Sequence, residues 1–245
     1  MKLKTYLSAP LPFQGQKRKF IKAFAGAIKD KPAPLYVDLF GGSGLLSHNA
    51  KATHPDAHVV YNDYDNFSRR LSTIPQTNAV LADLRKLNEG IKPDARLDGV
   101  QRERALERIK QEHGFVDYIT LSGSLLFSMN YVKTFEELSK ATMYNKIKLS
   151  DYQAEDYLAG VEVVSEDYKV IYNRYKDVPG VVFLIDPPYL STDCSSYENY
   201  WKLKDYLDVM LCLYDASYFY FTSNKSNVIE LCEWITTNTG GYDVV

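Results

Sequence analysis

The chain has 245 residues, 45% of them hydrophobic, which allows one large domain or one domain with an insertion. Its formal net charge of −2 gives no whole-chain support for nucleic-acid binding, which requires only local positive charge. No apolar run of about 18 residues, the length that spans a membrane, is present. The odd number of cysteines argues against a disulfide framework, and their spacing is not that of metal ligands. These features predict a soluble, cytoplasmic protein that does not span a membrane.

A strand, a glycine-rich turn and a helix start follow one another early in the chain. Residues 35–40 are typical of a buried strand, Gly41-Gly42-Ser43-Gly44 of a tight turn, and residues from Leu45 onward of a helix. Such an arrangement lets the backbone approach a nucleotide cofactor closely. A tight turn without a ligand is the alternative.

A second strand at residues 57–62 leads to Asp63, about 20 residues after the turn. A carboxylate at this place can accept hydrogen bonds from ribose hydroxyls. The dinucleotide fingerprint requires a third glycine where this chain has Ser47, so the pattern disfavours a nicotinamide cofactor.

Residues 68–160 read as a mostly helical insertion. Residues 101–113 are rich in good helix formers and stop at Gly114, residues 116–131 suit a buried helix, and another helix begins near Phe135. Residues 94–99 look like a loop. The insertion suits recognition of a target sequence, and a structural cap is the alternative.

Basic residues concentrate at the N-terminus and in the insertion, although the whole chain is slightly acidic. On a helix, Arg104 and Arg108 share a face at i,i+4 spacing, whereas Arg102 points elsewhere. These three arginines are candidate DNA contacts. Glu103 and Glu107 support the alternative that the arginines pair with them on a solvated helix.

Asp186-Pro187-Pro188-Tyr189 is the most informative stretch of the chain. It follows residues 181–185, an apolar run that is typical of a buried parallel strand. Open α/β sheets bind ligands at the carboxyl ends of such strands. The two prolines stiffen the loop and remove two hydrogen-bond donors, so the loop presents acceptors. Acceptors beside the aromatic Tyr189 favour a ligand with a planar ring that bears an amine. A proline-rich turn that caps a strand is the alternative.

Two more segments flank this motif. Residues 163–164 end a short strand, after which Asp167 and Tyr168 open a helix; on its own, an acidic residue there is ordinary capping. Residues 218–225 read as a strand followed by a Ser-Asn turn.

The order of these segments resembles that of the Dam-like DNA adenine N6-methyltransferases, the alpha group or D12 class. Phe40 to Gly44 is similar to their F-x-G-x-G pattern, and residues 186–189 are similar to their D-P-P-Y motif. Residues 12–17, Pro-Phe-Gln-Gly-Gln-Lys, are similar to their P-F-x-G-G-K segment, with Gln16 in place of the second glycine. For residues 12–17, the alternative interpretation is a basic arm on the surface. The resemblance covers the chain except roughly residues 68–160.

The resemblance implies a class I S-adenosylmethionine-dependent methyltransferase fold, a Rossmann-like α/β sheet with a helical insertion. Residues 1–67 and 161–245 would form the catalytic domain, and residues 68–160 the target-recognition insertion. The family ends with a sheet hairpin for which residues 240–245 leave little room, so we expect it to be incomplete.

The resemblance also implies the residues of the site. S-adenosylmethionine would be bound by Phe13, Gly15, Lys17, Asp38, Phe40, Gly41, Gly42, Ser43, Gly44, Asp63, Asp167, Tyr168 and Asp186. Catalysis would rest on Asp186, Pro187, Pro188 and Tyr189, with the target adenine flipped out of double-stranded DNA and no metal required.

Three alternatives stay open from the sequence. N4 of cytosine is a chemically similar target, an RNA or protein amine is another substrate, and a non-catalytic DNA-binding relic of the family is a different class.

Overall fold

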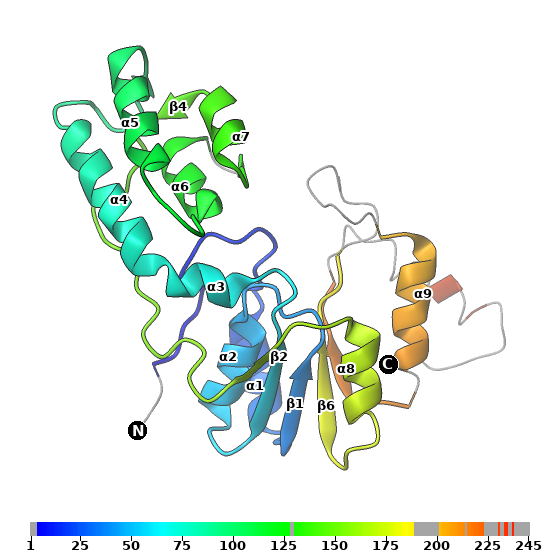
Figure 1. Ribbon diagram of the computed structural model, residues 1–245. Helices are drawn as coiled ribbons and strands as arrows, with labels where there is room; N and C mark the ends of the chain where they lie inside the picture. The colour runs from blue at the N-terminus through cyan, green and yellow to red at the C-terminus, as the bar shows by residue number, and fades with distance from the viewer. Residues whose placement is uncertain are drawn as a thin grey trace. The chain divides into compact units, whose positions relative to one another are not determined.

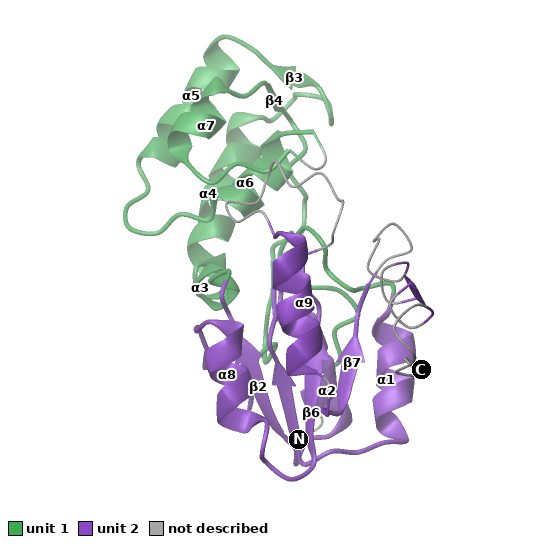
Figure 2. Cartoon of the chain, turned by 90° about the vertical axis from the view of Figure 1, so that its right-hand side faces the viewer, with its two compact units in different colours: residues 1–19, 65–159 green, residues 20–64, 160–245 purple. Residues whose placement is uncertain are grey.

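The computed structural model describes residues 4–127, 130–188, 201–213 and 215–222, together with residues 230, 233, 234 and 237. The chain groups into two units (Figure 2). Residues 1–19 and 65–159 form the helical unit, and residues 20–64 and 160–245 form the sheet unit.

Among the described residues, the sheet unit has five strands, which are all parallel (Figure 1). In spatial order these are β5 (Glu162–Val164), β2 (His58–Asn62), β1 (Leu35–Asp38), β6 (Val181–Ile185) and β7 (Tyr218–Tyr220). All five strands therefore end at one edge, called the carboxyl edge here. The order reverses between β1 and β6, which is the switch point at which open α/β sheets bind ligands. The predicted Rossmann-like α/β fold is confirmed.

Helices cover both faces of this sheet. The helices α8 (Tyr168–Tyr175) and α9 (Leu203–Cys212) cover one face, where Ile171, Val209 and Leu213 pack in a core with alternate strand residues. The helices α1 (Ile21–Lys29) and α2 (Leu45–Thr53) cover the other face. Successive strand residues point to opposite faces, so the side chains at the strand ends divide between these two layers.

The strands that carry the motifs lie close to their predicted positions. β6 matches residues 181–185, whereas β1 ends at Asp38 and leaves Leu39 and Phe40 in the following loop. The reason is the tight turn that begins at once, in which the Gly44 amide donates to the Gly41 carbonyl at 2.7 Å. Residues 223–225 and 238–245, which include the predicted Ser-Asn turn and chain end, lie outside the described residues.

The helical unit contains α3 (Phe67–Ser72), α4 (Ile74–Leu87), α5 (Val100–Lys110), α6 (Tyr118–Leu125) and α7 (Phe135–Lys140). The helix predicted over residues 116–131 ends at Leu125, because Leu126 is already extended. A loop was predicted over residues 94–99, but β3 (Arg96–Leu97) pairs there with β4 (Met143–Tyr144) in an antiparallel ribbon.

A buried ion pair organises the start of the helical unit. The guanidinium of Arg70 donates to Asp117 at 3.0 Å and to the Pro12 carbonyl at 2.8 Å. The ring of Phe13 packs edge-on against Phe67, with centroids 5.6 Å apart. These contacts hold Pro12 and Phe13 against the helices of the same unit. The division into a catalytic domain of residues 1–67 and 161–245 and an insertion of residues 68–160 stays a prediction. That the insertion recognises a target sequence stays a prediction.

Candidate active site

The carboxyl edge brings together the predicted site residues of the sheet unit. Each of them lies at the end of a strand, in the loop that follows it, or, for Tyr168, at the first residue of the next helix: Asp38, Phe40, Gly41, Gly42, Ser43, Gly44, Asp63, Asp167, Tyr168, Asp186, Pro187 and Pro188. Because the strands are parallel neighbours, residues that are far apart in sequence meet at this edge (Figure 1).

Two different physical reasons explain why glycines occupy the turn after β1, called the glycine turn here. Gly42 and Gly44 have positive φ angles of 50° and 69°, which side-chain-bearing residues adopt at a cost. A Cβ on Gly41 would lie 2.2 Å from ring carbons of Tyr61 and 2.9 Å from the Asn62 carbonyl oxygen. As the N-cap of α2, Gly44 has no side chain to satisfy the first amides of that helix. The turn is therefore compact, and the first amides of α2 have no side-chain cap at this end.

Asp38 ends β1 and is fully buried. The Ser47 hydroxyl donates to its Oδ2 at 2.7 Å, and its Oδ1 has no hydrogen-bond partner among the described residues. Burial raises the pKa of Asp38 to about 7, with a smaller contribution from the negative charge of Asp186. Ser47, which stands where the dinucleotide fingerprint has glycine, thus binds a carboxylate at the switch point.

Asn62 connects two loops of the carboxyl edge. Its side-chain amide donates to the carbonyl oxygens of Leu39 and Glu166, each at 3.0 Å, and accepts from the Glu166 amide at 3.1 Å. The glycine turn is thereby held beside the loop that begins α8. In the sequence, only its place before Asp63 marks Asn62, and that signal predicts no role for its side chain.

An aromatic group lies beside the glycine turn. The ring of Phe40 is 5.0 Å from that of Tyr168 and 5.4 Å from that of Trp201, measured between centroids. Burial raises the pKa of Tyr168 to about 12, so its phenol stays neutral. The Asp167 carboxylate accepts from the Lys169 amide at 2.8 Å, so it caps α8 in addition to any contact with a ligand.

The loop after β6 is held from α9. The hydroxyl of Tyr206, a buried residue, donates to the Pro188 carbonyl, and the Trp201 ring lies edge-on to Tyr206 at 5.3 Å. Asp186 begins the loop directly after Ile185, whose carbonyl accepts from the Phe221 amide at 2.8 Å. Tyr189, the predicted stacking residue, lies outside the described residues.

Comparison with known proteins identifies the family. The family model of the D12 class N6 adenine-specific DNA methyltransferases matches residues 13–209. The chain belongs to this family. A protein of Haemophilus influenzae (strain ATCC 51907 / DSM 11121 / KW20 / Rd) that carries the name "Putative methyltransferase" is 37% identical over 241 residues, which are 95% of this chain and 81% of that protein. The predicted enzyme class, methylation of adenine N6 in DNA, is confirmed.

The other predicted residues of this D12 methyltransferase lie in the helical unit. Gly15 has a positive φ of 83°, and the Lys17 ammonium donates to the Gly15 carbonyl at 2.9 Å. This geometry explains why the segment contains a glycine there. The roles of Phe13, Gly15 and Lys17 at the cofactor stay predictions.

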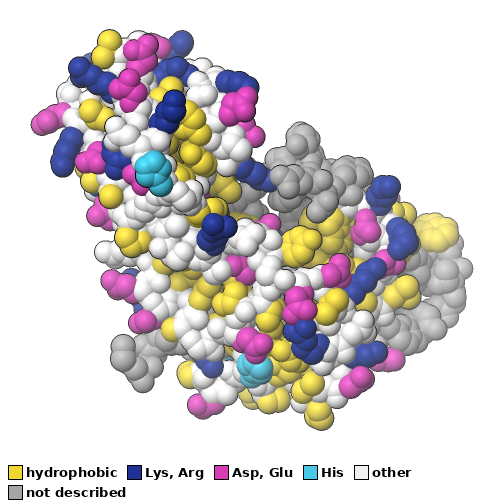
Figure 3. Space-filling model, viewed as in Figure 1, with side chains coloured by type: hydrophobic (Ala, Val, Ile, Leu, Met, Phe, Trp, Pro, Cys, Tyr) yellow, Lys and Arg dark blue, Asp and Glu magenta, His cyan; other side chains and the backbone are white. Residues whose placement is uncertain are grey.

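The three candidate DNA-contact arginines of the methyltransferase differ in their surroundings. Arg108 pairs with Asp83 at 2.8 Å and with Glu112 at 2.5 Å, and Arg102 donates to the Ser139 carbonyl. Arg104 is exposed. Basic and acidic side chains are interspersed over the helical unit (Figure 3). The described residues thus offer Arg104 rather than Arg108 to an external anion.

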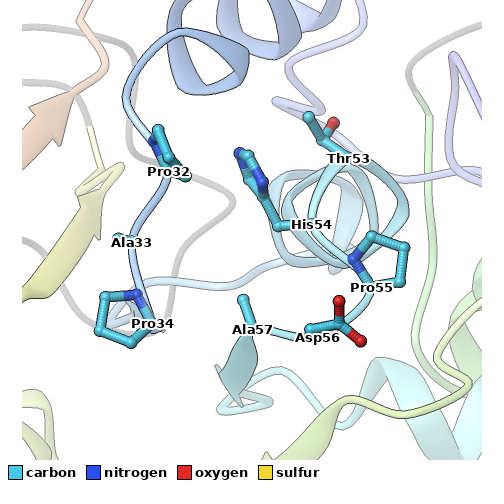
Figure 4. A pocket seen from close by; sticks show the side chains of 8 residues that line it. All are labelled: Pro32, Ala33, Pro34, Thr53, His54, Pro55, Asp56 and Ala57. Atoms are coloured by element: carbon cyan, nitrogen blue, oxygen red, sulfur yellow. The ribbon is translucent and has the colours of Figure 1, made fainter.

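A hollow of the methyltransferase lies at the opposite end of the strands. It is lined by residues that precede β1 and β2, among them Pro32, Pro34, His54 and Asp56 (Figure 4). The His54 Nε2 atom is 2.9 Å from the Ile28 carbonyl oxygen, and its ring stacks on Tyr36. The hollow is therefore separate from the carboxyl edge.

Neither a metal-ligand cluster nor a membrane-spanning helix is found among the described residues. They contain no group of three or more His, Cys, Asp and Glu side chains arranged to hold a metal ion. Among their helices, none has both the length and the apolar character that crossing a membrane requires.

Proposed function

We propose that this methyltransferase uses S-adenosylmethionine to methylate N6 of a flipped adenine in double-stranded DNA, with the chemistry at the carboxyl edge of the sheet unit. The observation that carries the proposal is the position of Asp186-Pro187-Pro188 beside the glycine turn, across the switch point between β6 and β1. The glycine turn and residues 186–188, called the acceptor loop here, therefore lie next to each other at the sheet edge, where such sheets bind ligands.

The residues of this edge fit the cofactor. The glycine turn has no room for a Cβ at Gly41, and Asp38 keeps a buried carboxylate oxygen without a hydrogen-bond partner among the described residues. Asp63 would accept from the ribose hydroxyls, and Asp167 and Tyr168 would contact the adenine of the cofactor. When bound, S-adenosylmethionine supplies an electrophilic methyl group on a positively charged sulfur.

The protein's task is to make a poor nucleophile reactive. The lone pair of the adenine amine is delocalised into the ring, which lowers its reactivity. If the Asp186 carboxylate and the Pro187 carbonyl accept hydrogen bonds from its two N–H groups, the amine nitrogen becomes more pyramidal. Its lone pair is then directed at the methyl group. Correct placement then lowers the barrier by proximity. Tyr189 would stack on the base, which leaves the duplex at a cost of a few kcal/mol.

A product analysis tests the proposal. Wild-type protein is incubated with unmethylated duplex DNA and S-adenosylmethionine, and the DNA is then digested to nucleosides. N6-methyladenine is expected; N4-methylcytosine or preferential competition by RNA would assign another substrate, and absence of both product and cofactor binding would indicate a non-catalytic relic.

An Asp186→Ala variant tests the role of the acceptor loop. Its single-turnover rate should fall while its DNA affinity changes little, because the acceptor acts mainly in the transition state. Asp177→Ala is the matched control, since Asp177 is an exposed carboxylate shortly before β6. A wild-type rate for Asp186→Ala would exclude the role.

A further inference from the structure

Tyr61 lies directly against the glycine turn, although it belongs to none of the family motifs described above. It is the fourth residue of β2 and is completely buried. Its ring carbons are the atoms that leave no room for a Cβ at Gly41. The turn is therefore packed directly against this ring.

The Tyr61 hydroxyl links two elements of the proposed cofactor site. Its oxygen is 2.7 Å from the Gly42 carbonyl oxygen and 2.8 Å from Oδ1 of Asp63. A hydroxyl has one proton, so it donates to one of these acceptors at a time, and its oxygen stays between both. The Asp63 amide is itself fixed by the Val164 carbonyl at 2.7 Å.

We propose that Tyr61 is a positioning residue for the cofactor, which holds the Asp63 carboxylate at a set orientation relative to the glycine turn. The inference rests on the proposed function, in which Asp63 accepts from the ribose hydroxyls. A carboxylate that is oriented before the ligand arrives loses less conformational freedom on binding, so affinity increases. The hydroxyl acts through Asp63 and does not touch the ligand.

The neighbouring strand offers a matched control. Tyr36 on β1 is also fully buried and points to the same face, because Tyr61 pairs in register with Asp38, two residues after Tyr36. Its hydroxyl accepts from the Ala33 amide at 3.1 Å and donates to the Lys31 carbonyl at 3.3 Å, at the opposite end of the strands. Tyr36→Phe thus removes a comparable hydroxyl far from the proposed site.

The experiment measures the affinity for S-adenosylmethionine by calorimetric titration, and the melting temperature, of wild type, Tyr61→Phe and Tyr36→Phe. Tyr61→Phe should bind about tenfold more weakly or worse, as expected for a hydrogen bond to a charged group. Tyr36→Phe should bind like wild type with a similar change in melting temperature. An equal loss of affinity in both variants, or no loss in Tyr61→Phe, would overturn the inference.

A double-mutant cycle distinguishes an effect of Tyr61 that acts through Asp63 from an effect that does not depend on Asp63. In an Asp63→Ala background, Tyr61→Phe should have no further effect on affinity, because the group that it positions is gone. A full additional loss would contradict the inference while leaving the proposed function intact. If wild type does not bind S-adenosylmethionine, the proposed function itself fails.

Discussion

Asp38, the last residue of β1, and Asp186, the first residue after β6, lie at the ends of neighbouring strands, close enough for the charge of Asp186 to act on Asp38. Asp38 pairs with Leu184 in register, and Asp186 lies two residues further along the same strand direction. Burial, assisted by the charge of Asp186, raises the pKa of Asp38 from its ordinary 3.8 to about 7. Near neutral pH the Asp38 carboxyl group is therefore protonated in part of the molecules.

Asp38→Asn should change how stability depends on pH. Between about pH 4 and about pH 7 the folded wild type binds a proton that the unfolded chain has released, so its free energy of unfolding falls as pH rises. This fall levels off above about pH 7, and Asp38→Asn should lack it. Denaturant unfolding of both proteins across this range checks the prediction; parallel stability curves would contradict it. Asp177→Asn, at an exposed position, is the control.

Gly41→Ala should weaken cofactor binding by displacing the glycine turn. The new Cβ would meet the Tyr61 ring and the backbone of Asn62, and overpacking of this kind costs about 1–3 kcal/mol. Gly26→Ala is the control, because this exposed glycine of α1 has nothing within 4 Å of an added Cβ. That variant should be more stable than wild type by about 0.5–1 kcal/mol. Titration with S-adenosylmethionine and thermal melting measure both effects; unchanged affinity in Gly41→Ala would refute the prediction.

Tyr206→Phe should slow methyl transfer without changing cofactor affinity. Its hydroxyl holds the Pro188 carbonyl, so its loss should let the acceptor loop shift, and a small misplacement costs about ten- to hundredfold in rate. Tyr172→Phe is the control, since that ring packs on Phe183 in the core below the edge. Single-turnover kinetics at saturating S-adenosylmethionine check the prediction, and a wild-type rate for Tyr206→Phe would show that the loop is held by other contacts.

Arg104 and Arg108 should behave differently, although their spacing alone predicts that they act as a unit. Arg104→Ala should weaken binding to all DNA sequences and reduce the salt dependence by about one phosphate contact. Arg108→Ala should instead lower the free energy of unfolding by about 1 kcal/mol, because Glu112 loses its ion pair with Arg108 and Asp83 keeps only the longer one with Lys86. Affinity at several salt concentrations and denaturant unfolding decide; equal effects of the two changes on DNA affinity would restore the original prediction.

The elements that carry the motifs were predictable because their signals are local. The apolar run of β6 and the prolines after it identify a strand that ends at a stiff loop, and the glycines after β1 identify a tight turn. The parallel arrangement then places both loops at one edge. The short strands β3 and β4 gave no such signal, because a two-residue strand has no periodicity to detect.

The sequence by itself determined the Rossmann-like class, the family and the loops that would hold cofactor and substrate. Only the tertiary structure decided which side chains orient those loops: Tyr61 beneath the glycine turn, Asn62 between two loops, and Tyr206 on the Pro188 carbonyl. It also decided that Arg108 is paired within its own unit. The physical reason is separation along the chain: Asn62 and Glu166 are 104 residues apart, and only the packing of parallel strands brings them within hydrogen-bond distance.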